Sequence, residues 1–423
     1  MTGRAIVLRG DAARLPLPDA SADLIVCSPP YFGLRSYTDD GEHYAGQIGS
    51  EGTPREYLEA LWRCTCDWIR VLKPCGSLFV NLGDKYAGSD ANSKAHTGAF
   101  LGTSRARATG KLVHDNHRVT PGQPKSLLGL PWRYALGCMD QLGLILRAEI
   151  IWDKPNGLPE SVTDRVRRSH EQVFHFTRQP RYYSAVDEVR EAYADLTDIR
   201  AGTGNGSKAG IVVQPGDRRR QRNDGILGTR QPRSLLGKLP GSVWSIPSAP
   251  LTVPEHLGID HFAAYPPELV RRIILGWSPR EVCTACGEGR RPVSVAEPAR
   301  TPQWALSQRQ GRSWHGDGAD PVRALGVAAA DRSRTITGYA CACHDTTAPA
   351  TPGLVLDPFG GTGTTALVAA VHGRTGITID RSADYSRLAA WRVSDPGERA
   401  RARELPKPPP VPDGMEPLFD MKA

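Results

Sequence analysis

The sequence contains no apolar run of the roughly 20 residues that a membrane-spanning helix needs. Its first residues also lack the long apolar stretch of a secretory signal peptide, because the apolar run before Arg9 extends only from Ala5 to Leu8. In a reducing compartment, the nine cysteines favour free thiols or a metal site over a disulfide framework. The composition therefore predicts a soluble protein of the cytoplasm, with no membrane as a partner.

Acidic residues are too few to balance the basic ones. The chain has 53 Lys and Arg against 45 Asp and Glu, which gives a formal net charge of +8 and a pI of about 9.0. A basic chain favours an anionic partner such as nucleic acid, although many nucleotide enzymes are mildly basic too. At about 100–200 residues per domain, 423 residues predict two or three domains, or one large domain with insertions.

Short apolar runs alternate with stretches of helical spacing, as in α/β proteins. Thr53 and Pro54 are typical of a helix start, and Pro74 and Gly76 end the helical pattern. Strands are expected within residues 5–8, 23–28, 77–84, 144–156, 170–178, 353–357 and 375–380, and helices within 53–76, 126–143, 261–279 and 363–373. Polar, poorly periodic stretches near 86–124 and 189–238 interrupt this alternation.

A glycine-rich turn lies near the carboxyl end, in the sequence VLDPFGGTGTTA. Gly361-x-Gly363-x-x-Ala366, between a strand and a helix, fits the turn by which dinucleotide-type folds approach a nucleotide. Asp380 ends the next strand, where an acid can bind ribose hydroxyls. The alternative is a tight turn without any ligand. Because only about 40 residues follow Asp380, the other strands must come from earlier in the chain, and the order of the fold is permuted.

Asp357-Pro358-Phe359 stands directly before these glycines. A carboxylate and an aromatic ring at that place suit a cationic amino-acid tail and an adenine better than a pyrophosphate. A nicotinamide-dependent enzyme, the other interpretation of the glycine turn, is therefore disfavoured.

A second motif, DLIVCSPPYFG at residues 23–33, ends an apolar run abruptly. Pro29 and Pro30 fix the backbone there, and Tyr31 and Phe32 add aromatic rings. An ordinary strand end is one interpretation of this corner, and a rigid pocket for a flat group is the other.

Together these motifs resemble those of the amino-group DNA methyltransferases that use S-adenosylmethionine. SPPY matches the catalytic tetrad of that family, (D/N/S)-P-P-(Y/F), and DPFGGTGTT matches its cofactor loop. The catalytic motif comes first and the cofactor loop last, which is the permuted β-type order, and the resemblance covers most of residues 1–280 and 351–395. It implies an α/β, Rossmann-like methyltransferase fold with a mixed seven-stranded sheet, circularly permuted and carrying insertions.

The resemblance also implies roles for individual residues. The implied catalytic residues are Ser28, Pro29, Pro30 and Tyr31. The residues implied to bind the cofactor are Asp11, Phe262, Asp357, Phe359, Gly360, Gly361, Gly363, Thr364 and Asp380. Asp357, Phe359 and the glycines are expected to line the methionine part of the cofactor. Asp380 is expected to hold the ribose, Asp11 to meet the adenine amine, and Phe262 to cover the cofactor from the other side.

The implied reaction is attack by the exocyclic amine of a flipped base on a sulfonium methyl group. Acceptors such as the Ser28 hydroxyl and the Pro29 carbonyl would localise the lone pair of this poor nucleophile. Stacking of Tyr31 on the base, about 1–3 kcal/mol, would offset much of the cost of flipping. Ser28 favours N4 of cytosine, because adenine enzymes of the family mostly carry Asp or Asn there. N6 of adenine is the alternative, and a non-catalytic nucleic-acid-binding protein with a decayed core is an alternative of another class.

Variable segments interrupt the expected core. The expected division is 1–85, catalytic half of the core; 86–124, variable insertion; 125–188, core continuation; 189–245, basic insertion for target recognition; 246–280, cofactor-covering turn and helix; 281–350, zinc-ribbon-like insertion; 351–395, cofactor-binding half; and 396–423, loose tail. The expected phosphate contacts are Arg165, Arg167, Arg168, Arg218, Arg219 and Arg220. For both groups of arginines, near residue 166 and near residue 219, the alternative is a charged loop exposed to solvent. Double-stranded DNA is the expected partner of this bacterial or phage-encoded chain, and a homodimer and a cognate restriction enzyme stay open.

Four cysteines are spaced like two metal-binding knuckles. Cys283-x-x-Cys286 and Cys341-x-Cys343 would supply four thiolates to a structural zinc ion. The second knuckle is tighter than usual, and His344 can replace one thiol. Zinc binding would explain how so polar a segment is ordered, whereas free thiols are the alternative.

Overall fold

The computed structural model describes residues 3–33, 38–39, 42–43, 46–88, 122–157, 159–192, 236–259, 264–296, 334–343, 345 and 347–406. The chain divides into two compact units. The first comprises Met1–Ser184, Ser242–Gly289 and Thr347–Ala423, and the second Ala185–Gly241 and Arg290–Thr346. Each unit is described by itself.

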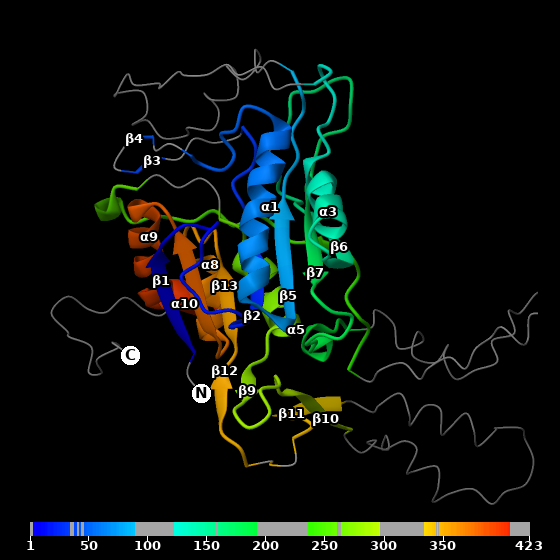
Figure 1. The fold of residues 1–423 in the computed structure, drawn as a ribbon. Coiled ribbons are helices and arrows are strands. Elements are labelled where there is room, and N and C mark those ends of the chain that lie inside the picture. The colour runs from blue at the N-terminus through cyan, green and yellow to red at the C-terminus, as the bar shows by residue number, and fades with distance from the viewer. Residues whose placement is uncertain are drawn as a thin grey trace, which may run out of the picture. The chain divides into compact units, whose positions relative to one another are not determined.

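A mixed sheet of eight strands forms the centre of the first unit (Figure 1). Its order is β1-β14-β13-β2-β5-β7-β6-β8. The bounds of these strands are Arg4–Arg9 (β1), Ala22–Cys27 (β2), Leu72–Leu82 (β5), Ile145–Asp153 (β6), His170–Thr177 (β7), Val243–Ser245 (β8), Leu354–Asp357 (β13) and Thr375–Asp380 (β14). The expected mixed sheet is therefore present, with the three-residue β8 added at its edge beyond the seven strands expected.

The strand directions bring many chain segments to one edge of the sheet. β1, β14, β13, β2 and β5 are parallel, and β7 runs antiparallel to its neighbours β5 and β6. The chain leaves β2 through α1 (Pro54–Val71) to β5, and it leaves β13 through α8 (Thr364–Val371) to β14 on the opposite side. Between β13 and β2 the strand order reverses, and in open α/β sheets ligands bind outside the carboxyl ends of the strands at such a point.

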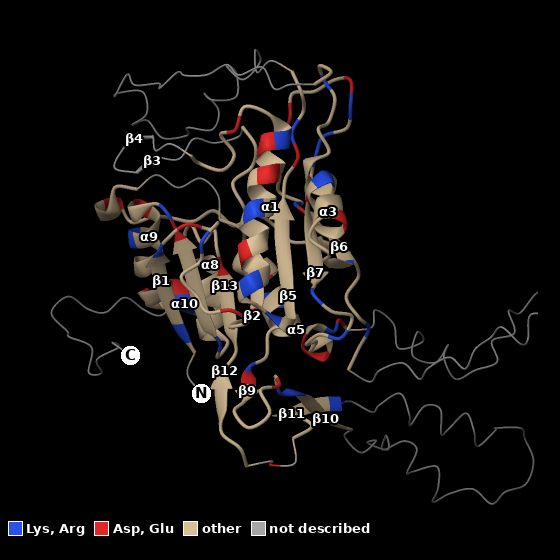
Figure 2. Ribbon diagram, viewed as in Figure 1, with Lys and Arg blue, Asp and Glu red and all other residues tan. Residues whose placement is uncertain are grey.

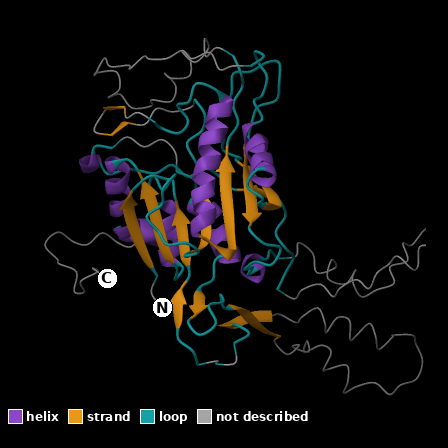
Figure 3. Cartoon of the chain, in the orientation of Figure 1, coloured by secondary structure: helices purple, strands orange, loops and turns teal. Residues whose placement is uncertain are grey.

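Helices cover both faces of this sheet (Figure 3). α1 and α3 (Leu130–Asp140) pack together on one face, and α5 (Pro267–Trp277), α8 and α10 (Pro396–Ala402) pack together on the other. α9 (Ala383–Ser394) contacts β1, β14 and α8. Fully buried aromatic side chains such as Trp68, Tyr134 and Phe176 join α1 and α3 to the sheet in the main hydrophobic core.

The start of α1 follows directly from its sequence. The Thr53 hydroxyl accepts from the Glu56 backbone N–H at 3.2 Å, and the Glu56 carboxylate accepts from the Thr53 N–H at 3.0 Å, which is a capping box. Pro54 occupies the first turn, where its missing N–H costs nothing. The outer side of α1 carries charges of both signs (Figure 2), including the exposed Arg55–Glu59 pair. Such a mixed face is typical of a solvated helix surface.

Smaller elements complete the two units. In the first unit, β9 (Glu281–Cys283) pairs with β12 (Ala350–Pro352), β3 (Thr38–Asp39) pairs with β4 (Glu42–His43), and residues Glu255–Leu257 form a 3-10 turn. In the second unit, β10 (Arg291–Ala296) pairs antiparallel with β11 (Arg334–Ala340), and Val186–Val189 form a 3-10 turn. None of the described helices is long and apolar enough to cross a membrane.

Candidate active site

The carboxyl edge of the sheet collects the residues of both sequence motifs. Ser28 follows β2, while Asp357 and Asp380 end β13 and β14. β7 enters this edge with its amino end, so Glu171 lies opposite Trp152, one residue before the end of β6. The topology therefore brings together residues that are far apart in the chain.

The SPPY corner is held rigidly from two sides. The Tyr57 hydroxyl of α1 donates to the Pro30 carbonyl at 2.9 Å, and the Phe32 ring packs on the Tyr57 ring. The Tyr31 ring lies so close to Gly83 that an added Cβ there would approach it to 2.6 Å. These contacts fix the Tyr31 ring at the carboxyl end of β2.

A buried polar network surrounds the Tyr31 hydroxyl. This hydroxyl donates to the Glu171 carboxylate at 2.6 Å and lies 3.2 Å from the Ser28 hydroxyl. The Asn81 amide N–H group donates to the Tyr31 oxygen and to Glu171, each at 2.8 Å, and lies 3.3 Å from the Ser28 oxygen. Lys154 forms an ion pair with the other oxygen of Glu171, and its ammonium lies over the Trp152 ring.

Charge is distributed unevenly in this network. Burial works to raise the pKa of Glu171, but the Lys154 ammonium and the donated hydrogen bonds outweigh it, so this pKa lies below its usual value. Burial, with the neighbouring Glu171, raises the pKa of Tyr31 well above its usual value. The network therefore holds an ionised Glu171, paired with Lys154, and a neutral Tyr31 at neutral pH.

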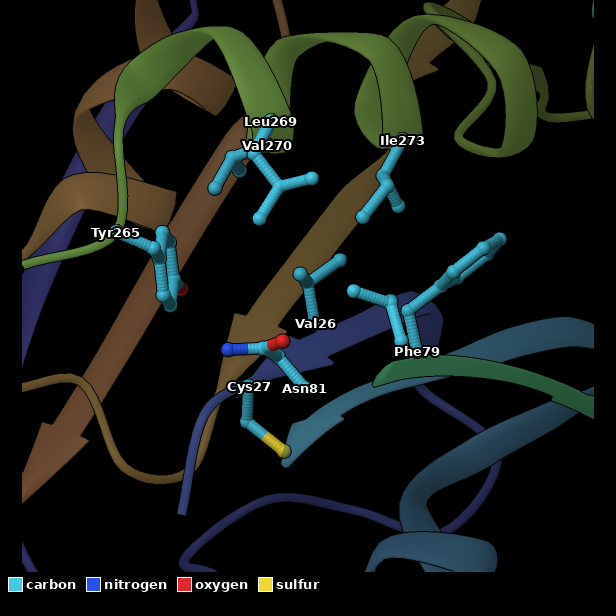
Figure 4. A pocket seen from close by; sticks show the side chains of 9 residues that line it. Val26, Cys27, Phe79, Asn81, Tyr265, Leu269, Val270 and Ile273 are labelled. Carbon is cyan, nitrogen blue, oxygen red and sulfur yellow. The ribbon is translucent and has the colours of Figure 1, made fainter. Parts of the chain in front are cut away.

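Asn81 also borders a small cavity beneath α5. Figure 4 shows its amide between the side chains of Val26, Cys27 and Tyr265. The cavity measures about 10 Å³, which is the space of a single water molecule at most. Among the described residues, the Asn81 carbonyl oxygen is a buried acceptor without a hydrogen-bond partner. This cavity is too small to be a base or cofactor pocket.

The glycine turn lies directly beside this corner. A side chain at Gly360 would come within 1.5 Å of the Thr378 hydroxyl, so the turn packs against β14 without room for one. Gly361 has φ +46°, and the nearest atom to an added Cβ is 4.0 Å away, so its outer side is open. The Asp380 carboxylate accepts from the Gly361 and Ser382 N–H groups, each at 2.9 Å. Asp380 therefore fixes the shape of the turn.

Asp357 is buried below the turn without a cationic partner among the described residues. Its carboxylate accepts from the Tyr265 and Thr365 hydroxyls, each at 2.6 Å, and from the Phe359 N–H at 3.1 Å. Burial raises the pKa of Asp357 to about 6, and these hydrogen bonds only partly oppose it. An ionised carboxylate in this place is suited to a positively charged ligand.

The comparison with known families agrees with this arrangement. Residues 22–282, more than half of the chain, match the model of a family described as DNA methylase. The chain belongs to the DNA methylase family. This result confirms the amino-group DNA methyltransferases that the SPPY and glycine-turn motifs predict.

Curated relatives of this DNA methylase are Type II methyltransferases. M.XycI of Xanthomonas campestris pv. cyanopsidis is 32% identical over 272 residues, which cover 63% of this chain and 71% of the relative. M.Cfr9I of Citrobacter freundii is 38% identical over 189 residues, or 44% of this chain. The match spans only 59% of the length of M.Cfr9I.

A solved structure with a similar course of the chain is the PvuII DNA methyltransferase (cytosine-N4-specific). It aligns with 96% of this chain and 94% of its own, with a TM-score of 0.47 and 16% sequence identity.

The structure brings together most of the predicted cofactor residues of this methylase. Phe359, Gly360, Gly361, Gly363 and Thr364 form the turn and the first residue of α8. Asp11 follows β1 and accepts from the Ala13 N–H at 2.9 Å. Phe262 lies outside the described residues.

The predicted phosphate contacts have partners within the chain or lie outside the described part. The Arg165 guanidinium pairs with Glu160 at 2.8 Å and lies over the Tyr86 ring. Arg167 donates to the Gly157 carbonyl at 3.0 Å, and Arg168 lies 3.8 Å from the Asp84 carboxylate. The residues outside the described part are Arg218, Arg219 and Arg220.

Four residues of the site were not predicted from the sequence as functional. They are Asn81, Lys154, Glu171 and Tyr265. Three of them lie within the expected strands 77–84, 144–156 and 170–178, but a single sequence does not reveal which strand ends meet. The signal that would have found Glu171 is a charged residue near the start of a strand whose second half is buried.

Proposed function

We propose that this chain transfers a methyl group from S-adenosylmethionine to the exocyclic N4 of a flipped cytosine in duplex DNA. The observation that carries the proposal is the rigid SPPY corner standing beside the glycine turn at the point where the strand order reverses. Membership of the DNA methylase family and likeness to Type II methyltransferases support a site-specific activity on DNA.

The corner residues have the chemistry that this reaction needs. The Ser28 hydroxyl and the Pro29 carbonyl accept hydrogen bonds from the target amine, which localises the nitrogen lone pair. Tyr31 offers an aromatic face for stacking on the flipped base. Because Tyr57 and Gly83 already fix this corner, little ordering is needed when the base enters.

The residues around the glycine turn fit S-adenosylmethionine. The open side of Gly361 gives the ligand close access to the backbone, and Asp357 offers a carboxylate without a cationic partner among the described residues. S-adenosylmethionine supplies a methyl group on a positively charged sulfonium. In this assignment Asp357 and Phe359 line its methionine part, Asp380 holds the ribose, Asp11 meets the adenine amine, and Phe262 covers the cofactor.

Transfer of a labelled methyl group tests the proposal against a decayed, non-catalytic core. The wild-type chain is mixed with methyl-labelled S-adenosylmethionine and bacterial genomic duplex DNA, and label in the DNA is counted. We expect label from the wild type and none above background from Tyr31→Ala, while calorimetry gives both chains the same cofactor affinity. Absence of label from the wild type, with S-adenosylmethionine still bound, would favour the non-catalytic alternative.

Ser28 is the observation that favours cytosine over adenine. Its short hydroxyl both donates and accepts, whereas the Asp or Asn usual in adenine enzymes of the family reaches further and accepts strongly. In the structure the Ser28 hydroxyl lies 3.2 Å from the Tyr31 hydroxyl. N6 of adenine is the second candidate, because one scaffold can present either amine.

We further propose structural zinc on Cys283, Cys286, Cys341 and Cys343. The sequence spacing of the two pairs, Cys283-x-x-Cys286 and Cys341-x-Cys343, supports this proposal. The first pair lies in a tight turn, in which the Gly287 N–H donates to the Cys283 carbonyl at 2.9 Å and Gly287 has φ +71°. Four thiols suit zinc in tetrahedral geometry. His344 lies outside the described residues.

The zinc content of freshly purified protein tests this site. We expect about one equivalent by elemental analysis, because four thiolates bind zinc tightly. Cys341→Ser is expected to lower the content, and Cys75→Ser, a change at an exposed cysteine outside the group, is the matched control. Less than about half an equivalent in the wild type would indicate free thiols.

A further inference from the structure

The hydrogen atoms of the Tyr31 network can be assigned from its geometry. A tyrosine hydroxyl has one hydrogen to donate, and the ionised Glu171 carboxylate 2.6 Å away can only accept. The Tyr31 hydrogen is therefore committed to Glu171. In the pair of Ser28 and Tyr31, which are 3.2 Å apart, the Ser28 hydroxyl must then be the donor.

The Asn81 amide leaves the Ser28 oxygen largely open. An amide nitrogen has two hydrogens, and three acceptors surround that of Asn81. The contacts to Tyr31 and Glu171, at 2.8 Å, take these hydrogens, and the contact to Ser28 is the longest at 3.3 Å. With its own hydrogen turned toward Tyr31, Ser28 keeps its lone pairs for an incoming donor.

We propose that Glu171 is a positioning residue for methyl transfer, which acts through Tyr31 to turn the Ser28 hydroxyl into an acceptor for the target amine. The same contacts form a path for the proton that the amine must lose. This inference rests on the proposed function and adds to it a carboxylate 140 residues away from the SPPY motif.

The proton path balances with the proposed transfer. The amine nitrogen bonds the methyl carbon as the carbon–sulfur bond breaks, and the nitrogen is left with one proton too many. Ser28 takes that proton and gives its own to the Tyr31 oxygen, while Tyr31 gives its own to Glu171, which becomes a neutral carboxylic acid. The carboxylate thus receives the proton without any charge forming on Ser28 or Tyr31.

Lys154 keeps Glu171 ready for this role. Among the described residues, the charged and polar groups that face the Glu171 carboxylate are Lys154 directly after β6, Asn81 from β5 and Tyr31. Removing the Lys154 ammonium leaves burial as the main influence, which raises the pKa of Glu171. A protonated Glu171 accepts poorly from Tyr31, so Ser28 is then no longer oriented.

The first test is a double-mutant cycle in single-turnover methyl transfer. We expect Glu171→Gln and Tyr31→Phe each to slow transfer by about tenfold or more with unchanged affinity for S-adenosylmethionine. Because both act on one path, the double variant is expected to be within about twofold of the slower single variant. Glu59→Gln, the same change on the exposed side of α1, is expected to keep the wild-type rate.

The second test is the pH profile of Lys154→Met. With saturating S-adenosylmethionine between pH 5.5 and 8, we expect its transfer rate to rise with pH as Glu171 ionises, while the wild-type rate is flat and Lys154→Met/Glu171→Gln is slow throughout. Glu171→Gln at the wild-type rate, effects of Glu171→Gln and Tyr31→Phe that multiply in the double variant, or a pH-independent Lys154→Met would each overturn the inference. A wild-type chain that binds S-adenosylmethionine and labels no DNA overturns the proposed function, and the inference with it.

Discussion

Single residues at the carboxyl edge of the sheet divide into acceptors that face the ligands and groups that hold those acceptors in place. Ser28 belongs to the first kind, because it keeps lone pairs for a ligand. Asp357 also belongs to it, because its hydroxyl and N–H partners leave its carboxylate without a cationic partner among the described residues. Glu171 belongs to the second, because Lys154, Asn81 and Tyr31 all bind its carboxylate. Asp380 orders the glycine turn through two N–H groups and is also the residue proposed to hold the ribose. Carboxylates at this edge therefore have different roles, which their hydrogen-bond partners distinguish.

Asp357 makes cofactor binding depend on pH. In the folded protein the pKa of Asp357 is about 6, above its ordinary value of 3.8, so this carboxyl is partly protonated near pH 6. Its contribution to the stability of the folded state is therefore lost as the pH rises from 3.8 to about 6. A cationic ligand binds the ionised form and lowers this pKa. We expect affinity for S-adenosylmethionine to increase about tenfold between pH 5 and 7, with proton release on binding.

Calorimetry of cofactor binding in two buffers of different ionisation enthalpy measures both quantities. Asp357→Asn keeps the size of the side chain and is expected to bind more weakly, with little change across the same pH range. A wild-type affinity that does not change between pH 5 and 7 would contradict the role of Asp357.

At the scale of elements, the end of β5 supports both the site and α3. Asn81 belongs to the Tyr31 network, whereas Asp84, three residues later, accepts from the Gly129 and Leu130 N–H groups at 2.9 and 3.0 Å. These N–H groups begin α3, whose own Gly129 has no side chain to cap them. An acid at a strand end, which in sequence is typical of a catalytic residue, is here a helix cap.

Asp84→Ala is expected to lower the free energy of unfolding by about 1–2 kcal/mol, since the first turn of α3 loses its acceptor. Urea denaturation followed by circular dichroism measures this change. Asp84→Asn keeps one acceptor oxygen and is expected to recover part of the loss. If Asp84→Ala unfolds at the wild-type urea concentration, water replaces the cap at no cost and the carboxylate is not structural.

Element prediction succeeded where the local signals were strong. Thr53 with Pro54 predicted the start of α1, and the strand, turn and helix around Gly361 are confirmed. The tail expected to be loose from residue 396 begins instead with α10. There Asp395 accepts from the Glu398 N–H at 2.8 Å and Pro396 occupies the first turn, a helix-start signal that the charged composition of the tail obscured.

At the scale of the whole molecule, the permuted order could be predicted and the meeting of strand ends could not. The late position of the glycine turn required earlier strands to complete the sheet, and β13 does lie between β14 and β2. Glu171 could not be assigned because its approach to Tyr31 depends on β7 entering the sheet antiparallel beside β5. Such strand pairing is set by tertiary packing, which a single sequence does not reveal.

The identity of the methylated nucleoside tests the proposed reaction most directly. Duplex DNA is incubated with the wild-type chain and S-adenosylmethionine, digested to nucleosides and examined by mass spectrometry, with Tyr31→Ala as the control. We expect N4-methylcytosine from the wild type and no methylated nucleoside above background from the control. N6-methyladenine without N4-methylcytosine would contradict the role given to Ser28, and no methylated nucleoside from a chain that binds S-adenosylmethionine would contradict the assignment of the site as a DNA methyltransferase.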